Sequence, residues 1–266
     1  MSGVGEVLAR AKAQGRAALV GYLPVGFPDV PGSIDAMVAM VEAGVDIVEI
    51  GVPYTDPLMD GPVIAHAADV ALQKGARLKD VFTAVRAVAD AGAPALVMTY
   101  WNPVLRYGVD RFADDLAQAG GAGLITPDLI PDEGADWMAA AERQGLDHVF
   151  LVAPSSTPQR LRSTAKACTG FVYAASSMGV TGARTTVGDA AQVLVTRTRQ
   201  MTDLPICVGL GVSTGAQAAQ VAAFADGVIV GSALVRCFTD AGGPADGLAA
   251  VRTLCAELAA GVRKRR

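Results

Sequence analysis

The chain has 266 residues, of which 52% are hydrophobic and 18% are charged, and its formal net charge is −4 at pH 7. This much apolar material can fill a large core, which excludes a disordered chain. The mildly acidic balance and the scattered basic residues exclude an extended basic surface for nucleic acid.

Short apolar or β-branched runs recur along the chain, and an Ala-rich amphipathic segment follows nearly every one. These runs predict eight strands, at residues 17–22, 46–49, 95–98, 123–125, 148–152, 171–174, 206–208 and 227–230. The matching helices are predicted at 31–43, 78–91, 110–119, 132–144, 158–166, 189–200, 213–223 and 245–260. Two extra helices are predicted at 4–13, before the first strand, and at 62–74, after the second.

Strands that alternate with helices indicate βαβ units and a parallel sheet. Eight such units in a chain near the usual length of about 250 residues favour an α/β fold of the closed (β/α)8 TIM-barrel type. No Pro/Gly/Ser-rich linker interrupts the cycle, so residues 1–266 are predicted to form a single barrel domain. The four basic residues 263–266 are interpreted as a loose solvated tail.

The remaining composition favours a cytoplasmic enzyme without metal. No apolar run reaches the roughly 18 residues of a membrane-span candidate, and Glu6 and Arg10 lie where a secretory signal needs an apolar centre. Four cysteines without C-x-x-C pairing are interpreted as reduced. His66 and His148 lie far apart in the sequence and outside any H-E-x-x-H group, so no metal site is expected.

Glu49 is a carboxylate among aliphatic residues on the second predicted strand. Period-2 geometry places it on the same face as Ile47, so that it projects into the mouth of the barrel, where the active sites of this fold form. Apolar surroundings would bring its proton affinity toward the range of a general acid or base. The alternative is a glutamate at the strand end that is held in an ion pair.

Asp60 follows Glu49 by eleven residues, after a loop that contains Pro53 and Pro57. Because proline restricts the chain, this loop could return a second carboxylate to the barrel mouth. Two carboxylates could then divide the work, one moving protons and the other stabilising positive charge. The alternative is that Asp60 is a turn residue or caps the helix that begins near Pro62.

Glycine-rich segments follow three later strands, at 179–182, 209–213 and 231–233. Backbone N–H groups in such loops and at a helix N-terminus favour an anion, and barrel enzymes often bind phosphate after the last two strands and at a short extra helix, here 232–238. Ordinary turns are the alternative. Neither G-x-G-x-x-G nor a P-loop motif occurs, so the phosphate would belong to a small substrate. Residues 179–187 are interpreted as a lid or a surface loop.

Four segments resemble signature sequences of the tryptophan synthase α subunit family: EIGVPYTDPLMDGP (49–62), YAASSMGVTGAR (173–184), GLGVS (209–213) and VGSALVR (230–236). The similarity extends from LVGYLPVGFPD (19–29) almost to the C-terminus. It implies a barrel that reversibly cleaves indole-3-glycerol phosphate to indole and glyceraldehyde 3-phosphate, as a retro-aldol lyase without metal or organic cofactor.

The resemblance also implies a role for each matching residue. Glu49 matches the acid/base carboxylate, Asp60 the carboxylate that accepts from the indole N–H, and Thr181 the lid threonine that approaches this aspartate on closure. The phosphate cradle comprises Gly182, Gly211, Gly231 and Ser232. The indole pocket wall comprises Tyr22, Ile64, Tyr173 and Leu210. Family members often have Phe near Tyr22 and Leu210, and Ala near Met59, so a pocket of different shape is expected here.

A protein partner is a further implication of the resemblance. The family works beside a pyridoxal-phosphate-dependent β subunit in an α2β2 heterotetramer, and indole passes to that subunit through a tunnel. The expected docking surface comprises Pro53, Asp56, Asn102, Asp128 and Pro131. The alternatives are a barrel isomerase or lyase that needs no partner, and a catalytically poor regulatory subunit, which the presence of both Glu49 and Asp60 argues against.

Overall fold

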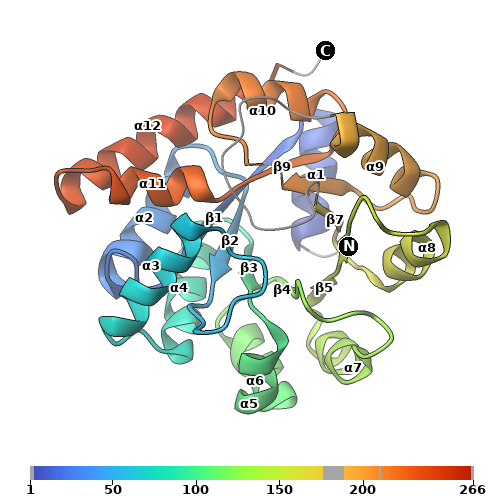
Figure 1. Ribbon diagram of the computed structural model, residues 1–266, viewed down its shortest axis with the longest axis horizontal. Helices are drawn as coiled ribbons and strands as arrows, with labels where there is room; N and C mark the ends of the chain where they lie inside the picture. The colour runs from blue at the N-terminus through green and yellow to red at the C-terminus, as the bar shows by residue number, and fades with distance from the viewer. Residues whose placement is uncertain (1–2, 176–188, 210, 265–266) are drawn as a thin grey trace.

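The computed structural model describes residues 3–175, 189–209 and 211–264, and the strands among them form one parallel sheet. The strand order is β5-β4-β3-β2-β1-β9-β8-β7-β6, and helices surround the strands on the outside (Figure 1). The strands are β1 Ala18–Pro24, β2 Ile47–Gly51, β3 Ala95–Met98, β4 Gly123–Ile125, β5 Asp147–Val149, β6 Leu151–Val152, β7 Val172–Ala175, β8 Ile206–Gly209 and β9 Gly227–Val230. The predicted TIM barrel is confirmed.

The barrel differs from the prediction at its fifth strand, which is divided into β5 and β6 at Phe150. β5 pairs with β4 and β6 pairs with β7, so the chain changes partner at this residue. Phe150 N donates to the sulfur of Cys168, at 3.4 Å, and its carbonyl accepts from Tyr173 N, at 3.3 Å. The two end strands of the sheet therefore adjoin in sequence, and the sheet curls into a nearly closed barrel.

The helices follow the predicted alternation, with bounds that differ by a few residues. They are α1 Gly3–Ala13, α2 Val30–Glu42, α3 Pro62–Gln73, α4 Leu78–Asp90, α5 Trp101–Tyr107, α6 Val109–Gln118, α7 Ala135–Gln144, α8 Pro158–Ala167, α9 Asp189–Arg199, α10 Gly215–Ala222, α11 Ser232–Thr239 and α12 Pro244–Val262. Both extra helices are present as α1 and α3. None of the helices that the structure describes is long and apolar enough to cross a membrane.

Two helical predictions need correction. The helix α5 was not expected, because its sequence is short and contains Pro103. The helix predicted from residue 132 begins at Ala135 instead. Turn hydrogen bonds from Glu133 N to the Ile130 carbonyl and from Gly134 N to the Pro131 carbonyl occupy the segment before it.

Alternate residues of the strands face two separate apolar layers, as the period of a strand requires. The outer layer, under the helices, includes Leu19 of β1 and Val48 of β2. The inner layer comprises strand residues that cluster with one face of α1. Its members include Val20, Ile47, Leu96, Ile125, Val149, Phe171, Cys207 and Ile229, together with Val4, Val7, Leu8 and Ala11 of α1. The helix α1 therefore closes the end of the barrel where the strands begin.

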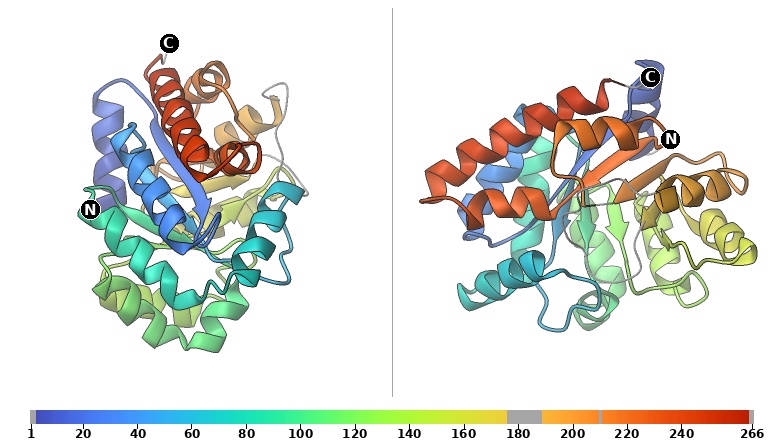
Figure 2. Two further views of the ribbon diagram at one scale, coloured as in Figure 1. Left: turned by 90° about the vertical axis from the view of Figure 1, so that its left-hand side faces the viewer. Right: turned by 45° about the horizontal axis from the view of Figure 1, so that its top comes forward.

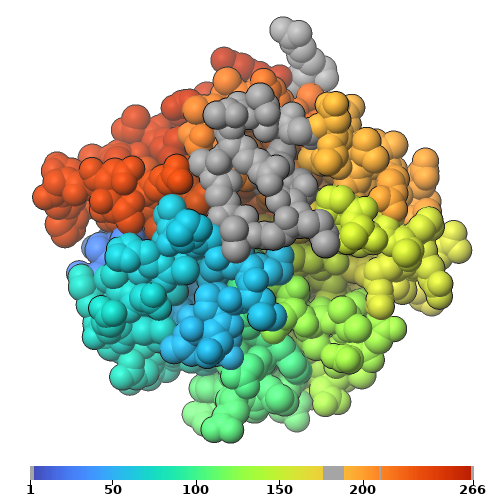
Figure 3. Space-filling model, in the orientation of Figure 1, coloured from blue at the N-terminus to red at the C-terminus, as the bar shows by residue number. Residues whose placement is uncertain are grey.

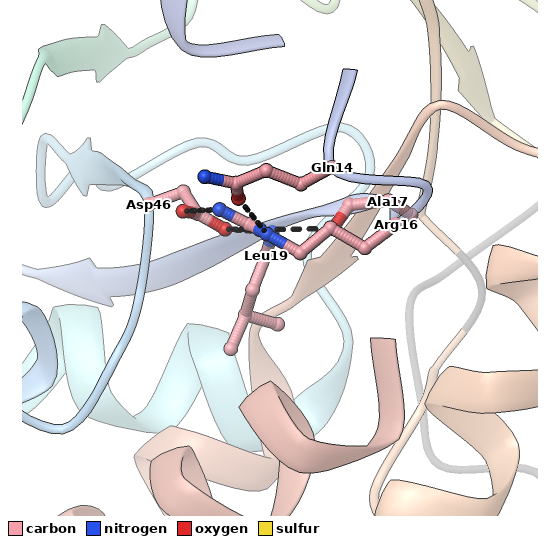
Figure 4. A network of polar contacts seen from close by, with 5 residues as sticks. All are labelled: Gln14, Arg16, Ala17, Leu19 and Asp46. Carbon is pink, nitrogen blue, oxygen red and sulfur yellow. Dashed lines mark hydrogen bonds and ion pairs between the residues drawn. The ribbon is translucent and has the colours of Figure 1, made fainter. Parts of the chain in front are cut away.

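A charged network joins the amino ends of β1 and β2 (Figure 4). Arg16 donates to both carboxylate oxygens of Asp46, at 2.7 and 2.8 Å, and both side chains are only 14% exposed. Asp46 also accepts from Leu19 N at 2.9 Å, while Arg16 donates to the Ala17 carbonyl and to Gln14. A bidentate pair of this kind is stronger than a single contact, and here it fixes where two neighbouring strands start.

Candidate active site

Glu49 lies in the middle of β2, opposite Tyr22 of β1 and Leu96 of β3. Its side chain is 1% exposed, and its Oε2 atom has no hydrogen-bond partner in the described part of the chain. Burial raises the pKa of this carboxyl from 4.5 to about 8. No ion pair with Glu49 occurs among residues 3–175, 189–209 and 211–264, so the ion-pair alternative has no support. A buried carboxyl with this pKa can both donate and accept a proton near neutrality.

Asp60 lies near the end of the loop 52–61, which joins β2 to α3. Its Oδ1 atom accepts from the Tyr100 hydroxyl, at 2.8 Å, and this hydroxyl in turn accepts from Met59 N, at 3.0 Å. Burial raises the pKa of the Asp60 carboxyl, while the Tyr100 hydrogen bond opposes the rise. Gly61 is the N-cap of α3 and its cap makes no side-chain hydrogen bond, so the capping role considered for Asp60 is wrong.

Tyr22 connects the two carboxyl groups. The pKa of its phenol is raised well above 10 by burial first, and then by the charges of Asp60 and Glu49, so both carboxyl groups lie within electrostatic range of one ring. A Cβ on Gly51 would lie 2.3 Å from the Tyr22 hydroxyl, and one on Gly231 would lie 3.3 Å from the ring. Glycine at these two positions therefore leaves room for the phenol between β2 and β9.

Tyr173 of β7 is a second phenol that the Glu49 charge affects. Burial raises the pKa of its phenol most, and the Glu49 charge adds to the rise. A Cβ on Gly209 would approach the Tyr173 hydroxyl to 2.6 Å, so this glycine also makes space for a ring. Ile64, the remaining described member of the expected indole pocket, lies in the first turn of α3 and is 8% exposed. The charges of Glu49 and Asp60 thus both act on the Tyr22 phenol, and that of Glu49 acts on Tyr173 as well.

The residues expected to hold phosphate follow β8 and β9. Gly211 has φ of +62°, which favours glycine. Gly231 is the N-cap of α11, and Ser232 is the first residue of that helix and is 6% exposed. The first N–H groups of a helix have no acceptor within it, and they favour an anion. Three further expected site residues, Thr181, Gly182 and Leu210, lie outside the described residues, as does the lid segment 179–187.

The residues expected to dock the partner lie on loops that follow β2, β3 and β4. Pro53 is buried and Asp56 is exposed on the loop 52–61, part of whose blue to cyan atoms lie on the face that Figure 3 shows. Asn102 Nδ2 donates to the Tyr54 hydroxyl, at 2.9 Å, and the Tyr54 and Tyr100 rings are 5.6 Å apart. The loop that carries Asp60 is thereby tied to the start of α5.

Asp128 and Pro131 lie on the next loop, between β4 and α7. Trp101 N donates to Asp128 Oδ1, at 2.9 Å, so this loop is also tied to the start of α5. Burial raises the pKa of the Asp128 carboxyl. Sequence reasoning missed Tyr54 and Tyr100, the two aromatic residues that connect these loops to Asp60. The available signal was the aromatic pair Tyr100-Trp101, which begins two residues after the predicted strand 95–98.

Among the residues that the structure describes, no group of three His, Cys, Asp or Glu side chains is placed to hold a metal ion. The site consists of two carboxyl groups whose pKa values are raised by burial, two phenols and a helix N-terminus. Such a set can transfer protons to a bound molecule, stabilise positive charge on it and bind an anionic group.

Comparisons with known proteins agree on one family. The model of the family "Tryptophan synthase alpha chain" matches residues 8–263. The tryptophan synthase alpha chain of Mycobacterium avium is 62% identical over 264 residues, which cover 99% of this chain and 96% of that protein. A structure of Mycobacterium tuberculosis tryptophan synthase has a TM-score of 0.93 at 60% identity and covers 98% of each chain.

A more distant structure leads to the same conclusion. The alpha subunit of tryptophan synthase from Legionella pneumophila has a TM-score of 0.89 at 30% identity, and the match covers 98% of each chain. The matches in sequence and in structure thus extend over 98–99% of this chain. This chain belongs to the tryptophan synthase alpha chain family.

Proposed function

We propose that this chain catalyses the reversible cleavage of indole-3-glycerol phosphate to indole and glyceraldehyde 3-phosphate, a retro-aldol lyase reaction in tryptophan biosynthesis. The observation that carries the proposal is that the charges of Glu49 and Asp60 both raise the pKa of the Tyr22 phenol, and that a Cβ on Gly231, the N-cap of α11, would lie 3.3 Å from the same ring. A substrate with an aromatic group at one end and a phosphate at the other suits this arrangement.

Glu49 acts as the acid and then as the base. With a pKa of about 8, its carboxyl is largely protonated at pH 7. It gives this proton to the ring carbon that bears the glycerol chain, which produces a cationic indolenine. The resulting carboxylate then takes the proton of the adjacent glycerol hydroxyl. The carbon–carbon bond breaks, its electron pair returns to the ring, and the hydroxyl carbon becomes the aldehyde, so the charges balance.

Asp60 stabilises the cationic intermediate. As a carboxylate it accepts from the indole N–H and offsets the positive charge that forms on the ring. The Tyr100 hydrogen bond favours the ionised form of Asp60 and fixes one of its oxygen atoms. The Glu49 Oε2 atom has no hydrogen-bond partner in the described chain, whereas Asp60 accepts from Tyr100, and this difference favours the ionised form more at Asp60 than at Glu49.

The remaining expected residues bind the substrate. The N–H groups of Gly211, Gly231 and Ser232, together with Gly182, hold the phosphate. The indole lies against the pocket wall of Tyr22, Ile64, Tyr173 and Leu210. Thr181 on the lid approaches Asp60 when the site closes. None of these steps requires a metal or an organic cofactor in this chain.

We also propose that the chain works with a pyridoxal-phosphate-dependent β subunit, as an α2β2 heterotetramer in the cytoplasm. The relatives with solved structures include the tryptophan synthase of Mycobacterium tuberculosis. The loop 52–61 is hydrogen-bonded to Tyr100 through Met59 and Asp60, and to Asn102 through Tyr54. Docking of the partner on this loop would therefore order Asp60. The partner should therefore raise the rate of indole formation.

Two substitutions test the assignment of the carboxyl groups. Glu49→Gln and Asp60→Asn should each lower the rate of indole formation by about 10²- to 10⁴-fold, measured with and without the β subunit. Glu133→Gln and Asp69→Asn, at exposed positions, are matched controls that should keep the parental rate. Both site variants should still bind glycerol phosphate. A site variant that cleaves the substrate at the parental rate would remove the role assigned to that residue.

A further inference from the structure

The loop 52–61, which carries Asp60, is attached to the rest of the described chain at one place. The hydrogen bonds that residues 53–60 make with other described segments all end on Tyr100 or Asn102, the N-cap and the second residue of α5. Figure 1 and the right view of Figure 2 show this blue to cyan loop beside the green helices that follow β3. The position of Asp60 therefore depends on the start of α5.

The start of α5 is itself fixed to the barrel. Thr99 N donates to the Ile125 carbonyl of β4, at 3.2 Å, and Trp101 N donates to Asp128 Oδ1 on the loop after β4, at 2.9 Å. The residue between these two donors is Tyr100, which is 6% exposed. Because the backbone on both sides of Tyr100 is hydrogen-bonded to the neighbouring strand and its loop, the ring is a firm support for the loop 52–61.

The direction of the Tyr100 hydroxyl follows from its two partners. Met59 N can only donate, so the hydroxyl accepts from it, at 3.0 Å, and gives its single proton to Asp60 Oδ1, at 2.8 Å. Burial is the main cause that raises the pKa of this phenol, so the proton stays on it near neutral pH. One hydroxyl thus binds two successive residues of the loop and occupies Oδ1, which leaves Oδ2 for another donor.

Tyr54 joins this arrangement to an exposed residue. The Tyr54 and Tyr100 rings have centroids 5.6 Å apart and planes inclined by 36°, within the range in which aromatic pairs attract each other. The Tyr54 hydroxyl accepts from Asn102 Nδ2, at 2.9 Å, and Asn102 is exposed. A continuous set of contacts therefore leads from Asn102 at the surface through two tyrosines to the carboxyl of Asp60.

We propose that Tyr54 and Tyr100 are positioning residues for Asp60, which together fix its carboxyl so that Oδ2 meets the N–H of a bound indole ring. Tyr100 acts directly through its hydroxyl. Tyr54 acts through Tyr100, because its ring packs on that ring while Asn102 holds its hydroxyl. The inference rests on the proposed function, in which Asp60 accepts from the indole N–H. A small displacement of the carboxyl weakens this hydrogen bond, since such groups must be held within a narrow range of positions.

The test compares the affinities of two ligands for the full chain by isothermal titration calorimetry. The ligands are 3-(indol-3-yl)propyl phosphate and its benzothiophene counterpart, which has sulfur in place of the N–H. The parent should prefer the indole ligand about tenfold or more, because a hydrogen bond to a charged group is a strong one. Tyr100→Phe, which keeps the ring and removes the hydroxyl, should lower this preference about fivefold or more. A purely structural defect would weaken both ligands equally and leave the preference unchanged.

Further variants test the part played by Tyr54. Tyr54→Phe removes the hydrogen bond with Asn102 and should lower the preference about threefold. The double variant should match Tyr100→Phe alone, because Tyr54 acts through Tyr100. Tyr107→Phe is the matched control, since the Tyr107 hydroxyl on the last turn of α5 also donates to a carboxylate, that of Asp115, and this variant should keep the parental preference.

The outcomes separate this inference from the proposed function. A parent chain without preference for the indole ligand would contradict the role proposed for Asp60 and the inference with it. A parent that prefers the indole ligand, together with an unchanged preference in Tyr100→Phe, would overturn the inference alone. Effects of Tyr54→Phe and Tyr100→Phe that multiply in the double variant would overturn the step in which Tyr54 acts through Tyr100.

Discussion

Glu49 is buried in a position that disfavours its charge, and this position lowers the stability of the fold as well as setting the proton affinity of the site. The carboxyl is 1% exposed, its Oε2 has no partner in the described chain, and its pKa is about 8 instead of 4.5. Below pH 4.5 the folded and unfolded chains both carry the proton. Between pH 4.5 and about 8 only the folded chain retains it, so stability falls as the pH rises.

Glu49→Gln should therefore stabilise the protein at high pH while it lowers the rate of indole formation. Glutamine stays neutral at every pH, so the variant lacks the loss of stability between pH 4.5 and about 8. The free energy of unfolding of the variant should exceed that of the parent by on the order of 4 kcal/mol at pH 9, and by much less at pH 5. Urea unfolding of the variant and the parent at pH 5 and pH 9 measures this difference in the free energy of unfolding.

The exposed variant Glu133→Gln is the control for this measurement and should differ from the parent by the same small amount at both pH values. If Glu49→Gln were no more stable than the parent at pH 9, Glu49 would have a compensating partner in solution. Asp60 illustrates the contrasting case, since its hydrogen bond with Tyr100 opposes the effect of burial on its pKa.

At the scale of elements, the sequence predicts those features that depend on local pattern. The apolar runs located every strand, because the strands of a parallel barrel are buried on both faces. The position of Glu49 also followed, because the alternation along β2 places it on the inner face with Ile47. Glu49, which the pattern singled out, takes part in no ion pair among residues 3–175, 189–209 and 211–264.

Features that depend on contacts between distant residues could not be predicted. The hydrogen bond from Tyr100 to Asp60 joins residues 40 positions apart, and nothing in the local sequence of either residue requires it. The break in the fifth strand depends on Phe150 N donating to Cys168, 18 positions away.

The helices α10 and α12 lie so close together that the addition of one methyl group tests their packing. A Cβ on Gly261 of α12 would lie 2.2 Å from the Gly215 carbonyl oxygen of α10. Glycine to alanine within a helix normally stabilises a protein by about 0.5–1 kcal/mol. Here Gly261→Ala should instead lower the free energy of unfolding by about 1–3 kcal/mol, because the two backbones must separate. Urea unfolding of the variant and the parent shows whether the free energy of unfolding falls or rises.

Gly3→Ala is the matched control, since it also lies in a helix and a Cβ there would have no neighbour within 4 Å. It should be neutral or slightly stabilising. A stabilised Gly261→Ala variant would mean that α12 can move away from α10 without loss of packing, and the barrel would then tolerate displacement of its last helix.

At the scale of the whole molecule, the barrel has two ends with different tasks. One end is closed by α1 and fixed by the Arg16–Asp46 pair, which is largely buried. The other end carries the proposed active site on loops, so its geometry depends on contacts between loops and on the proposed β subunit. This division separates the residues that hold the fold from those that serve the reaction.

Two exposed apolar side chains at the loop end should form part of the docking surface. Leu58 on the loop 52–61 is 73% exposed, and Ile130 on the loop after β4 is 40% exposed. Burying a side chain of this size contributes about 1.5–3 kcal/mol. Leu58→Ser and Ile130→Ser should therefore each weaken binding of the β subunit about tenfold or more, measured by titration of the stimulated indole formation.

Val193→Ser on α9 is the control, because Val193 is 54% exposed but lies on a helix of the outer layer and away from these loops. All three variants should unfold at the parental urea concentration, since none of the side chains is buried in the free chain. Weaker docking in Val193→Ser together with normal docking in the two loop variants would place the partner on the side of the barrel. Indole could then not pass directly from the barrel mouth to the partner, and the two sites would have to exchange it through solvent.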